Sequence, residues 1–144
     1  MNPDLVLVRR FLAASGVPLA VASNPLAIAL GLRLEAYDAE CRELAMRCEP
    51  QPLFRQGAGV VQGGAVASML DFAMAFAGFT QLGDADALST VTINVVLQKA
   101  ATAASYELRG RVDKPGRRIM FASAALTAGD SVIATATSTL LVLR

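Results

Sequence analysis

The sequence predicts an α+β domain in which an antiparallel sheet wraps around one long, buried helix. A glycine-rich stretch at 57–64 leads into the segment from Ala65 to Phe79, which is apolar almost all round, as a buried helix is. The chain after this segment is rich in Val, Thr and Ile and is divided by short turns, which is typical of strands. Strands segregated around a single helix predict the α+β class.

The first residues predict a helix within 1–16. Asn2-Pro3-Asp4 combines a capping Asn, a Pro at the first helical position and an acid in the first turn, and Gly16 with Pro18 ends the helix. An alternative is a secretory signal, because two arginines precede the apolar run 11–21 and the small residues 20–22 resemble a cleavage site. Asp4, Gly16 and Pro18 weaken that alternative. Prolines also interrupt the uncharged run 11–32, so it does not predict a transmembrane helix.

The remaining elements follow in order within one domain, 1–144. A short turn or helix opens at Asn24-Pro25, a loop covers Glu49 to Gly59, and the long helix extends to about Leu82 before a turn at Gly83–Asp86. Strands are predicted, from alternation or from β-branched residues, at Leu30–Tyr37, Cys41–Cys48, Ser89–Gln98, Ser105–Asp113, Arg117–Thr127 and Ser131–Leu143.

Composition limits the classes of function. Apolar residues make up 54% of the chain and charged residues 17%, which favours an oligomer that hides surface. A net charge of +1 without a basic stripe argues against a nucleic-acid partner. The chain has no histidine and only Cys41 and Cys48, so we expect no metal site. These cysteines are expected to be buried free thiols, in keeping with a reducing compartment, and we expect the protein to be cytoplasmic.

The start of the long helix carries the candidate chemistry. A glycine-rich loop that leads into a helix leaves free backbone N–H groups at the positive end of the helix dipole, and these can hold an anion or polarise a carbonyl. Asp71 is the one charged residue of the apolar segment. It either reaches a wet cleft or occupies a narrow stripe that faces solvent. Gly63 and Asp71 are eight residues apart, or roughly 12 Å along a helix at about 1.5 Å per residue.

One carbonyl group therefore cannot touch the Gly63 N–H and the Asp71 carboxylate of the same chain. Two chains with antiparallel helices would bring Gly63 of one copy near Asp71 of the other. Small residues three and four positions from Asp71, such as Ala67 and Ala75, would let a second helix approach. Ordinary packing of a helix on a sheet also favours small residues, so it explains these alanines without a dimer.

The run Gly59-Val60-Val61-Gln62-Gly63-Gly64, followed on the helix by Asp71, resembles a known pattern. It is similar to hotdog-fold acyl-CoA thioesterases of the phenylacetate-degradation and 4-hydroxybenzoyl-CoA thioesterase group. Their pattern is a glycine, two residues, His-Gly-Gly, and then an Asp or Glu on the helix. Further matching positions are Gln56, Thr90, the Gly116-Arg117-Arg118 turn and the final strand at Ala134-Thr135-Ala136-Thr137. The resemblance covers roughly Asn24 to Leu143.

The resemblance implies a hotdog fold and roles for these positions. The Gly63 N–H, with Gly64 shaping the turn, would stabilise the oxyanion, and Asp71 would act as nucleophile or as general base on water. Gln56 would orient the water or the acyl carbonyl. Thr90 would hydrogen-bond Asp71 or the water, unless it is an ordinary β-branched strand residue. The chain departs from the family at Gln62, the position of the family His, because Gln donates a hydrogen bond but carries no proton.

The implied function is hydrolysis of acyl-CoA thioesters to free acid and coenzyme A. The sites would lie at the interface of a homodimer or a dimer of dimers, with no cofactor and no membrane partner. Lys114, Arg117 and Arg118 would bind coenzyme A phosphates, or would simply form a solvated turn. A protein that binds acyl-CoA but turns it over weakly, or a purely structural oligomer, are the alternatives.

Overall fold

The computed structural model describes residues 1–83 and 86–144. Within them, one antiparallel sheet of seven strands runs in the order β1-β2-β3-β5-β6-β7-β4. The strands are β1 (Leu19–Ala20), β2 (Arg33–Asp38), β3 (Glu43–Cys48), β4 (Ala87–Leu97), β5 (Tyr106–Lys114), β6 (Ile119–Ala128) and β7 (Ser131–Leu143). The helices are α1 (Pro3–Ala13), α2 (Pro25–Ala29), the 3₁₀ turn η1 (Pro52–Phe54) and α3 (Gly63–Phe79).

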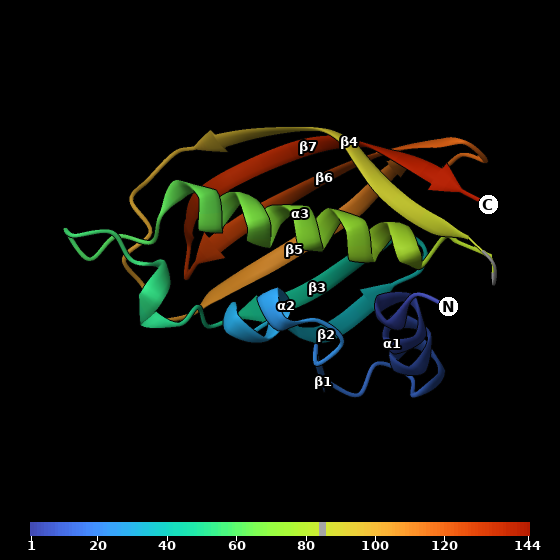
Figure 1. Cartoon of the computed structure of the whole chain (residues 1–144), viewed down its shortest axis with the longest axis horizontal. Helices are drawn as coiled ribbons and strands as arrows, with labels where there is room; N and C mark the ends of the chain where they lie inside the picture. Colours follow the sequence, from blue (N-terminus) through green and yellow to red (C-terminus); the bar gives the residue numbers. More distant parts are fainter. Residues whose placement is uncertain (84–85) are drawn as a thin grey trace.

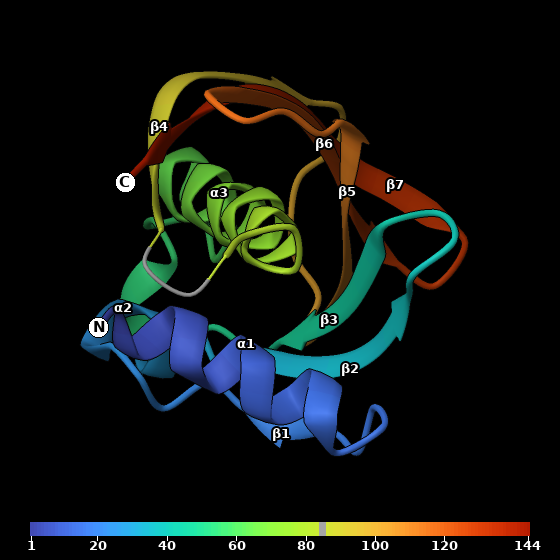
Figure 2. The ribbon, with the colours of Figure 1, turned by 90° about the vertical axis from the view of Figure 1, so that its right-hand side faces the viewer.

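The sheet curls around α3, as the sequence predicted (Figures 1 and 2). Helix α3 crosses the inner face of the sheet and packs against β3 to β7. Gly110 of β5 allows its closest approach, because a Cβ atom at this position would lie 2.0 Å from the Ala73 carbonyl oxygen. A residue without a side chain is therefore required where the helix rests on the sheet.

Helix α1 covers the β1–β2 side of the molecule (Figure 2). Asn2 caps it as predicted, with its Oδ1 accepting from the Asp4 N–H at 2.9 Å. Asp4 also accepts from the Ser23 hydroxyl and, at 3.0 Å, from Asn24 Nδ2. These bonds join the start of α1 to the cap of α2. Side chains of α1 enter the core: Leu5, Leu7, Val8 and Phe11.

Several boundaries differ from the sequence prediction. The first long strand begins at Arg33 rather than Leu30, because Leu30 caps α2 and Gly31 has a φ of +62°. The next begins at Glu43 rather than Cys41, because Arg42 lies in a turn with a φ of +53°. The two-residue β1 and the turn η1 were not predicted. The predicted Gly83–Asp86 turn lies partly outside the described residues.

The prediction of two buried thiols is half wrong. Cys48 is buried beneath α3, where its Sγ lies 3.2 Å from the sulfur of Met69. Cys41 is exposed, because its turn precedes β3 instead of belonging to the strand. Both cysteines are free.

Candidate active site

The site is organised by the N-terminus of α3. Gln62 precedes the first helical residue, and its N–H donates to the Phe54 carbonyl at 2.7 Å. The N–H groups of Gly63 and Gly64 donate to no acceptor among the described residues. Two unused donors at the positive end of a helix are suited to polarise a carbonyl oxygen.

A cleft of about 330 Å³ lies beside these donors. One wall consists of residues of the segment 56–66, and the other of the end of β4 and the chain that follows it, 97–101. Three of the predicted residues, Gln56, Gln62 and Gly63, line it together. Gln98 and Lys99 line the opposite wall, and the sequence alone gave no reason to select them. The Gln56 Oε1 accepts from the Ala58 N–H at 2.6 Å, so this side chain also holds the turn within its own loop.

Asp71 lies two turns further along α3, on the side of the helix that the sheet leaves open. We call this side the open stripe, and its members are partly or fully exposed: Gly64, Ala67, Ser68, Asp71, Phe72 and Ala75. The Thr90 hydroxyl of β4 donates to Asp71 Oδ1 at 2.9 Å. This bond was one of the two alternatives for Thr90 in the sequence prediction. It fixes the carboxylate while one oxygen keeps its full hydrogen-bonding capacity.

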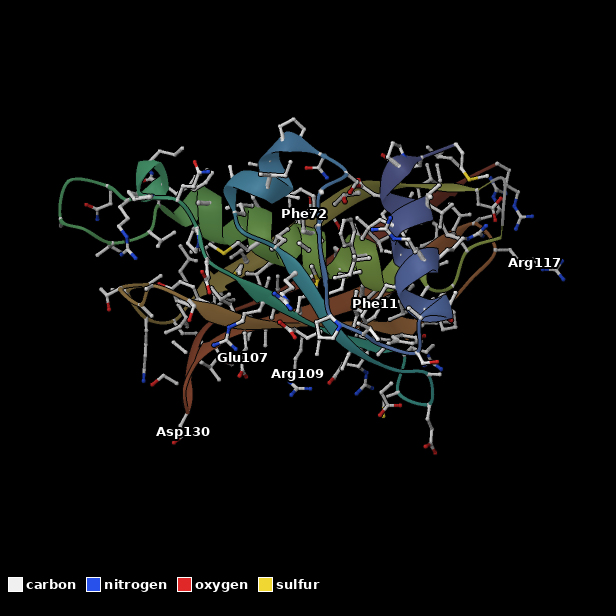
Figure 3. The ribbon with its side chains drawn as sticks, turned by 90° about the horizontal axis from the view of Figure 1, so that it is seen from below. Phe11, Phe72, Glu107, Arg109, Arg117 and Asp130 are labelled. Atoms are coloured by element: carbon white, nitrogen blue, oxygen red, sulfur yellow. The ribbon has the colours of Figure 1, made fainter. Side chains whose placement is uncertain are left out.

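The predicted phosphate-binding residues do not join this group within one chain. Lys114, Arg117 and Arg118 belong to the β5–β6 turn, at the end of the molecule opposite the 56–63 loop (Figure 3). All three are exposed. The turn is held near the C-terminus, where the Val142 N–H donates to the Arg118 carbonyl at 2.8 Å.

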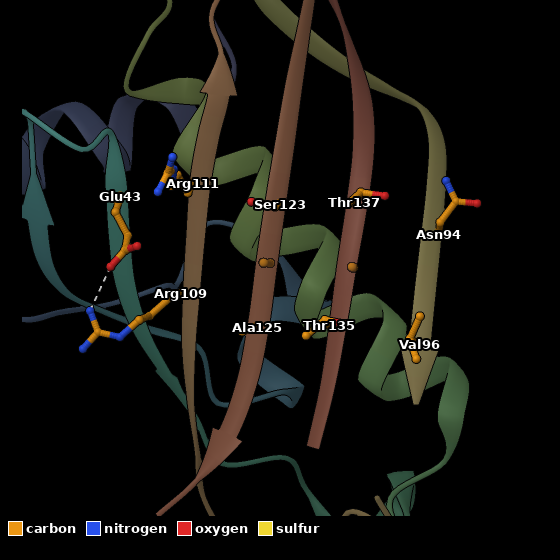
Figure 4. Close-up of a pocket in the computed structure, with 11 residues that line it drawn as sticks. Glu43, Asn94, Val96, Arg109, Arg111, Ser123, Ala125, Thr135 and Thr137 are labelled. Carbon is orange, nitrogen blue, oxygen red and sulfur yellow. Dashed lines mark hydrogen bonds and ion pairs between the residues drawn. The ribbon is translucent and has the colours of Figure 1, made fainter. Parts of the chain in front are cut away.

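A larger hollow, of about 470 Å³, lies on the outer face of the sheet, with α3 on the other side (Figure 4). Its charged residues are paired: Arg109 with Glu43 at 2.9 Å, and Arg111 with Asp113 at 3.3 Å. The floor consists of small side chains such as Ser123, Ala125 and Thr135. Asp71 and Gly63 do not line this hollow, so its size does not make it the reaction site.

Other reactive groups in the described part of the chain do not form a second centre. No group of three or more potential metal ligands occurs there. Burial raises the pKa of the Cys48 thiol to about 12, which keeps it protonated and unreactive. None of the helices described is both long and apolar enough to span a membrane.

A long helix wrapped by an antiparallel sheet, with free amides at its start and a carboxylate on its open side, defines the class of hotdog thioester hydrolases. The medium/long-chain acyl-CoA thioesterase YigI of Escherichia coli K12 is 31% identical over 107 residues, which are 72% of this chain and 67% of that protein. The chain therefore belongs to the acyl-CoA thioesterase family. No protein-family model matches it.

Solved structures agree with this assignment. A phenylacetic acid degradation-related protein from Ralstonia eutropha JMP134 superposes with a TM-score of 0.81 at 27% identity, covering 94% of this chain and 98% of that one. A thioesterase family protein from Silicibacter pomeroyi superposes with a TM-score of 0.79 at 26% identity, covering 97% and 98%. The hotdog fold and the hydrolase class that the sequence implied are confirmed.

Proposed function

We propose that this protein hydrolyses acyl-CoA thioesters at a site completed by a second copy of the chain. One observation carries the proposal: Asp71 is held by Thr90 on the open stripe, eight residues along α3 from the free Gly63 amide. The helical rise puts roughly 12 Å between them, which is too far for both to touch one carbonyl carbon. A second α3 running antiparallel would bring the partner's carboxylate to the amide.

Strand β4 supports this arrangement. It is an edge strand of eleven residues, and it is mostly exposed. Val91, Val96 and Leu97 are 57%, 58% and 54% exposed. An apolar edge of this length is rare in a protein that stays monomeric. A two-fold axis at β4 would pair two copies of the strand antiparallel and would cover the neighbouring open stripe at the same time.

The same axis gives the β5–β6 turn a role. The turn lies at the far end of the molecule from the cleft, so an antiparallel partner would carry it toward the cleft of the first copy. Lys114, Arg117 and Arg118 would then bind the phosphates of coenzyme A. Within the described residues none of the three makes an ion pair.

In the proposed reaction, the Gly63 N–H polarises the thioester carbonyl and stabilises the oxyanion, while Gly64 keeps this turn free of side-chain bulk. Asp71 of the partner attacks the carbonyl carbon, or removes a proton from the water that attacks it. The carbon–sulfur bond breaks and coenzyme A leaves as the thiolate. Where Asp71 is the nucleophile, water then hydrolyses the acyl–Asp71 anhydride to the free acid; in both cases the thiolate takes up the proton that the water gives up. Thr90 orients the carboxylate, and Gln56 orients the water or the carbonyl.

The presence of Gln62 at the family's His position is an argument that the Asp71 carboxylate is the main catalytic group. Gln62 is exposed, makes no side-chain cap on α3, and belongs to a chain without histidine. Its amide can hydrogen-bond the substrate, but it cannot transfer a proton. If the reaction uses a side-chain base, Asp71 is therefore the proposed base.

The name of the Escherichia coli relative suggests medium- and long-chain acyl groups as substrates here too. The half-buried Phe72 on the open stripe and the apolar edge of β4 would supply an apolar surface for such chains. The two free thiols, one of them exposed, support a reducing location such as the cytoplasm.

A thiol-release screen over aryl-, short-, medium- and long-chain acyl-CoAs tests the proposal. We expect turnover with at least one class, highest for medium or long chains. A protein that is protected from heat by acyl-CoA but releases no thiol would be a binding protein instead. If acyl-CoA neither protects the protein from heat nor is hydrolysed, only the alternative of a structural oligomer remains.

A further inference from the structure

Apart from the start of α3 and the last residue of β4, the two walls of the cleft belong to segments without regular secondary structure. The first wall is the exposed, glycine-containing loop before α3, and the second follows the end of β4. They meet at Gly63, where an added Cβ would lie 3.0 Å from Leu97 Cδ1. Nothing like a strand ladder fixes their separation, so the width of the cleft depends on a few individual bonds.

Arg55 makes two of those bonds with one side chain. Its Nη1 donates to the Gly59 carbonyl at 2.7 Å, and its Nη2 donates to the Ala103 carbonyl at 2.8 Å. Gly59 belongs to the loop of the first wall, and Ala103 follows the second wall by two residues. The planar guanidinium fork therefore bridges the two segments at a fixed separation.

Two backbone contacts lie beside the bridge made by the Arg55 side chain. Arg55 pairs with Val61 in an isolated antiparallel bridge, and the Val61 N–H donates to the Ala101 carbonyl at 2.9 Å. Val61 is two residues before Gly63, so a shift of the backbone bridge between Arg55 and Val61 would move the start of α3. An error of about 1 Å in the position of a catalytic donor can reduce a rate by about 10²-fold.

We propose that Arg55 is a positioning residue that sets the width of the cleft and the direction of the Gly63 N–H. It does not touch the reacting atoms; it acts through the two walls. The expected effect on kcat rests on the proposed thioesterase function. The two hydrogen bonds of Arg55 do not depend on that function. Because both bonds go to carbonyl oxygens, the shape of the donor matters as well as its charge.

The decisive variant is Arg55→Met, which keeps an unbranched apolar stem and removes every donor. We expect kcat for the best acyl-CoA to fall about 10- to 100-fold, with KM changing less than about 3-fold, because a misaligned oxyanion donor weakens mainly the transition state. Arg55→Lys can keep one of the two bonds and should recover part of kcat. Equal kcat for wild type and Arg55→Met would overturn the proposal.

Arg42→Met is the matched control. Arg42 also donates to two backbone carbonyls, Val112 at 3.0 Å and Asp113 at 3.4 Å, but it lies at the β2–β3 turn and these bonds reach neither segment beside the cleft. We expect it to keep the wild-type kcat. If both variants lose kcat to the same degree, Arg55 has a general structural role and the proposal is wrong.

Hydrogen exchange gives a readout that does not need turnover. In Arg55→Met the amides of Val61 and Gln62 should exchange at least about 10-fold faster, while those in the middle of α3 stay unchanged. Unchanged exchange at Val61 and Gln62 would overturn the bridge even if the protein proved not to be a thioesterase. A wild type that releases no thiol would instead contradict the proposed function.

Discussion

The two edges of the sheet are built in opposite ways. The β1 edge is two residues long, and α1 covers this side of the molecule (Figure 2). The β4 edge is eleven residues long and carries exposed valine and leucine side chains. A short, covered edge offers no template for another strand, whereas a long apolar edge does. We infer that the β1 side of the fold is complete in a single chain and that the β4 side binds a partner.

The candidate chemistry lies beside the β4 edge. Asp71 and its partner Thr90 lie where α3 meets β4, and the Gly63 cleft ends at the chain leaving β4. The covered side contributes a buried core and the hydrogen bonds of Asp4. Substitutions on the two sides should therefore differ in kind: stability should change on one, and activity and assembly on the other.

Asp71→Asn should give the largest effect. The substitution preserves shape and removes the charge of the proposed nucleophile or base, so kcat should fall at least about 10²-fold. Folding, assembly and heat protection by acyl-CoA should persist, because Asn keeps the shape of the side chain and an oxygen that can accept from the Thr90 hydroxyl. Similar kcat for variant and wild type in a thiol-release assay would assign Asp71 to a solvent-facing stripe without catalytic function.

Gly110→Ala tests the core between the two edges, where α3 rests on the central strand β5. The added methyl would collide with the Ala73 carbonyl, so we expect a loss of about 2–3 kcal/mol in the free energy of unfolding. Gly57→Ala is the control, since nothing lies within 4 Å of its added Cβ and Gly57 is exposed outside the open stripe. Urea denaturation at fixed protein concentration measures both. Equal stability of the two variants would contradict the close packing of α3 on β5.

Val91→Glu tests the open edge. A charge in the middle of an apolar interface should separate the copies, and activity should fall at least about 10-fold as the site loses its partner. Val17→Glu provides the control, because Val17 is 62% exposed, against 57% for Val91, and lies in the loop before β1. Sedimentation at micromolar concentration should show a monomer only for Val91→Glu. For the wild type, the same measurement distinguishes a dimer from a dimer of dimers. A fully active wild-type monomer would end the idea of a shared site.

The buried thiol of Cys48 should make the stability of the protein depend on pH. Its pKa of about 12 exceeds the ordinary value of 9.0 because burial disfavours the thiolate. The unfolded chain therefore loses this proton first, and stability should fall as pH rises from 9 toward 12, by about 1 kcal/mol at pH 10. Denaturation of Cys48→Ala should lack this contribution. In the native protein, thiol reagents should modify Cys41 and spare Cys48; rapid labelling of both would contradict its burial.

Gln62→His should give the smallest effect. Gln62 is exposed and its side chain does not cap α3, so the fold should persist and turnover should not fall. The imidazole would occupy the position at which the family carries its His. Thiol release compared at equal folded concentration checks this, and a large loss of kcat would show that the amide of Gln62 has a role of its own.

Local patterns were sufficient to predict much of this protein. The cap at Asn2, the apolar segment of α3 and the alternation in Ser131–Leu143 depend on neighbours in sequence, and the structure confirms all three. The predicted starts of β2 and β3 were wrong because hydrophobic alternation does not reveal the positive φ angles of Gly31 and Arg42. The exposure of Cys41 follows from the second of these errors.

The sequence by itself determined the class of fold, the glycine-rich start of α3 and a single carboxylate on it, because helical spacing and apolar periodicity are local properties. Only the tertiary structure decided that Thr90 bonds to Asp71, that Arg55 bridges the walls of the cleft, and that the β5–β6 turn lies at the opposite end. Those contacts join residues brought together by the order of strands in the sheet. That order is set by the packing of the whole core, which no segment of the sequence expresses alone.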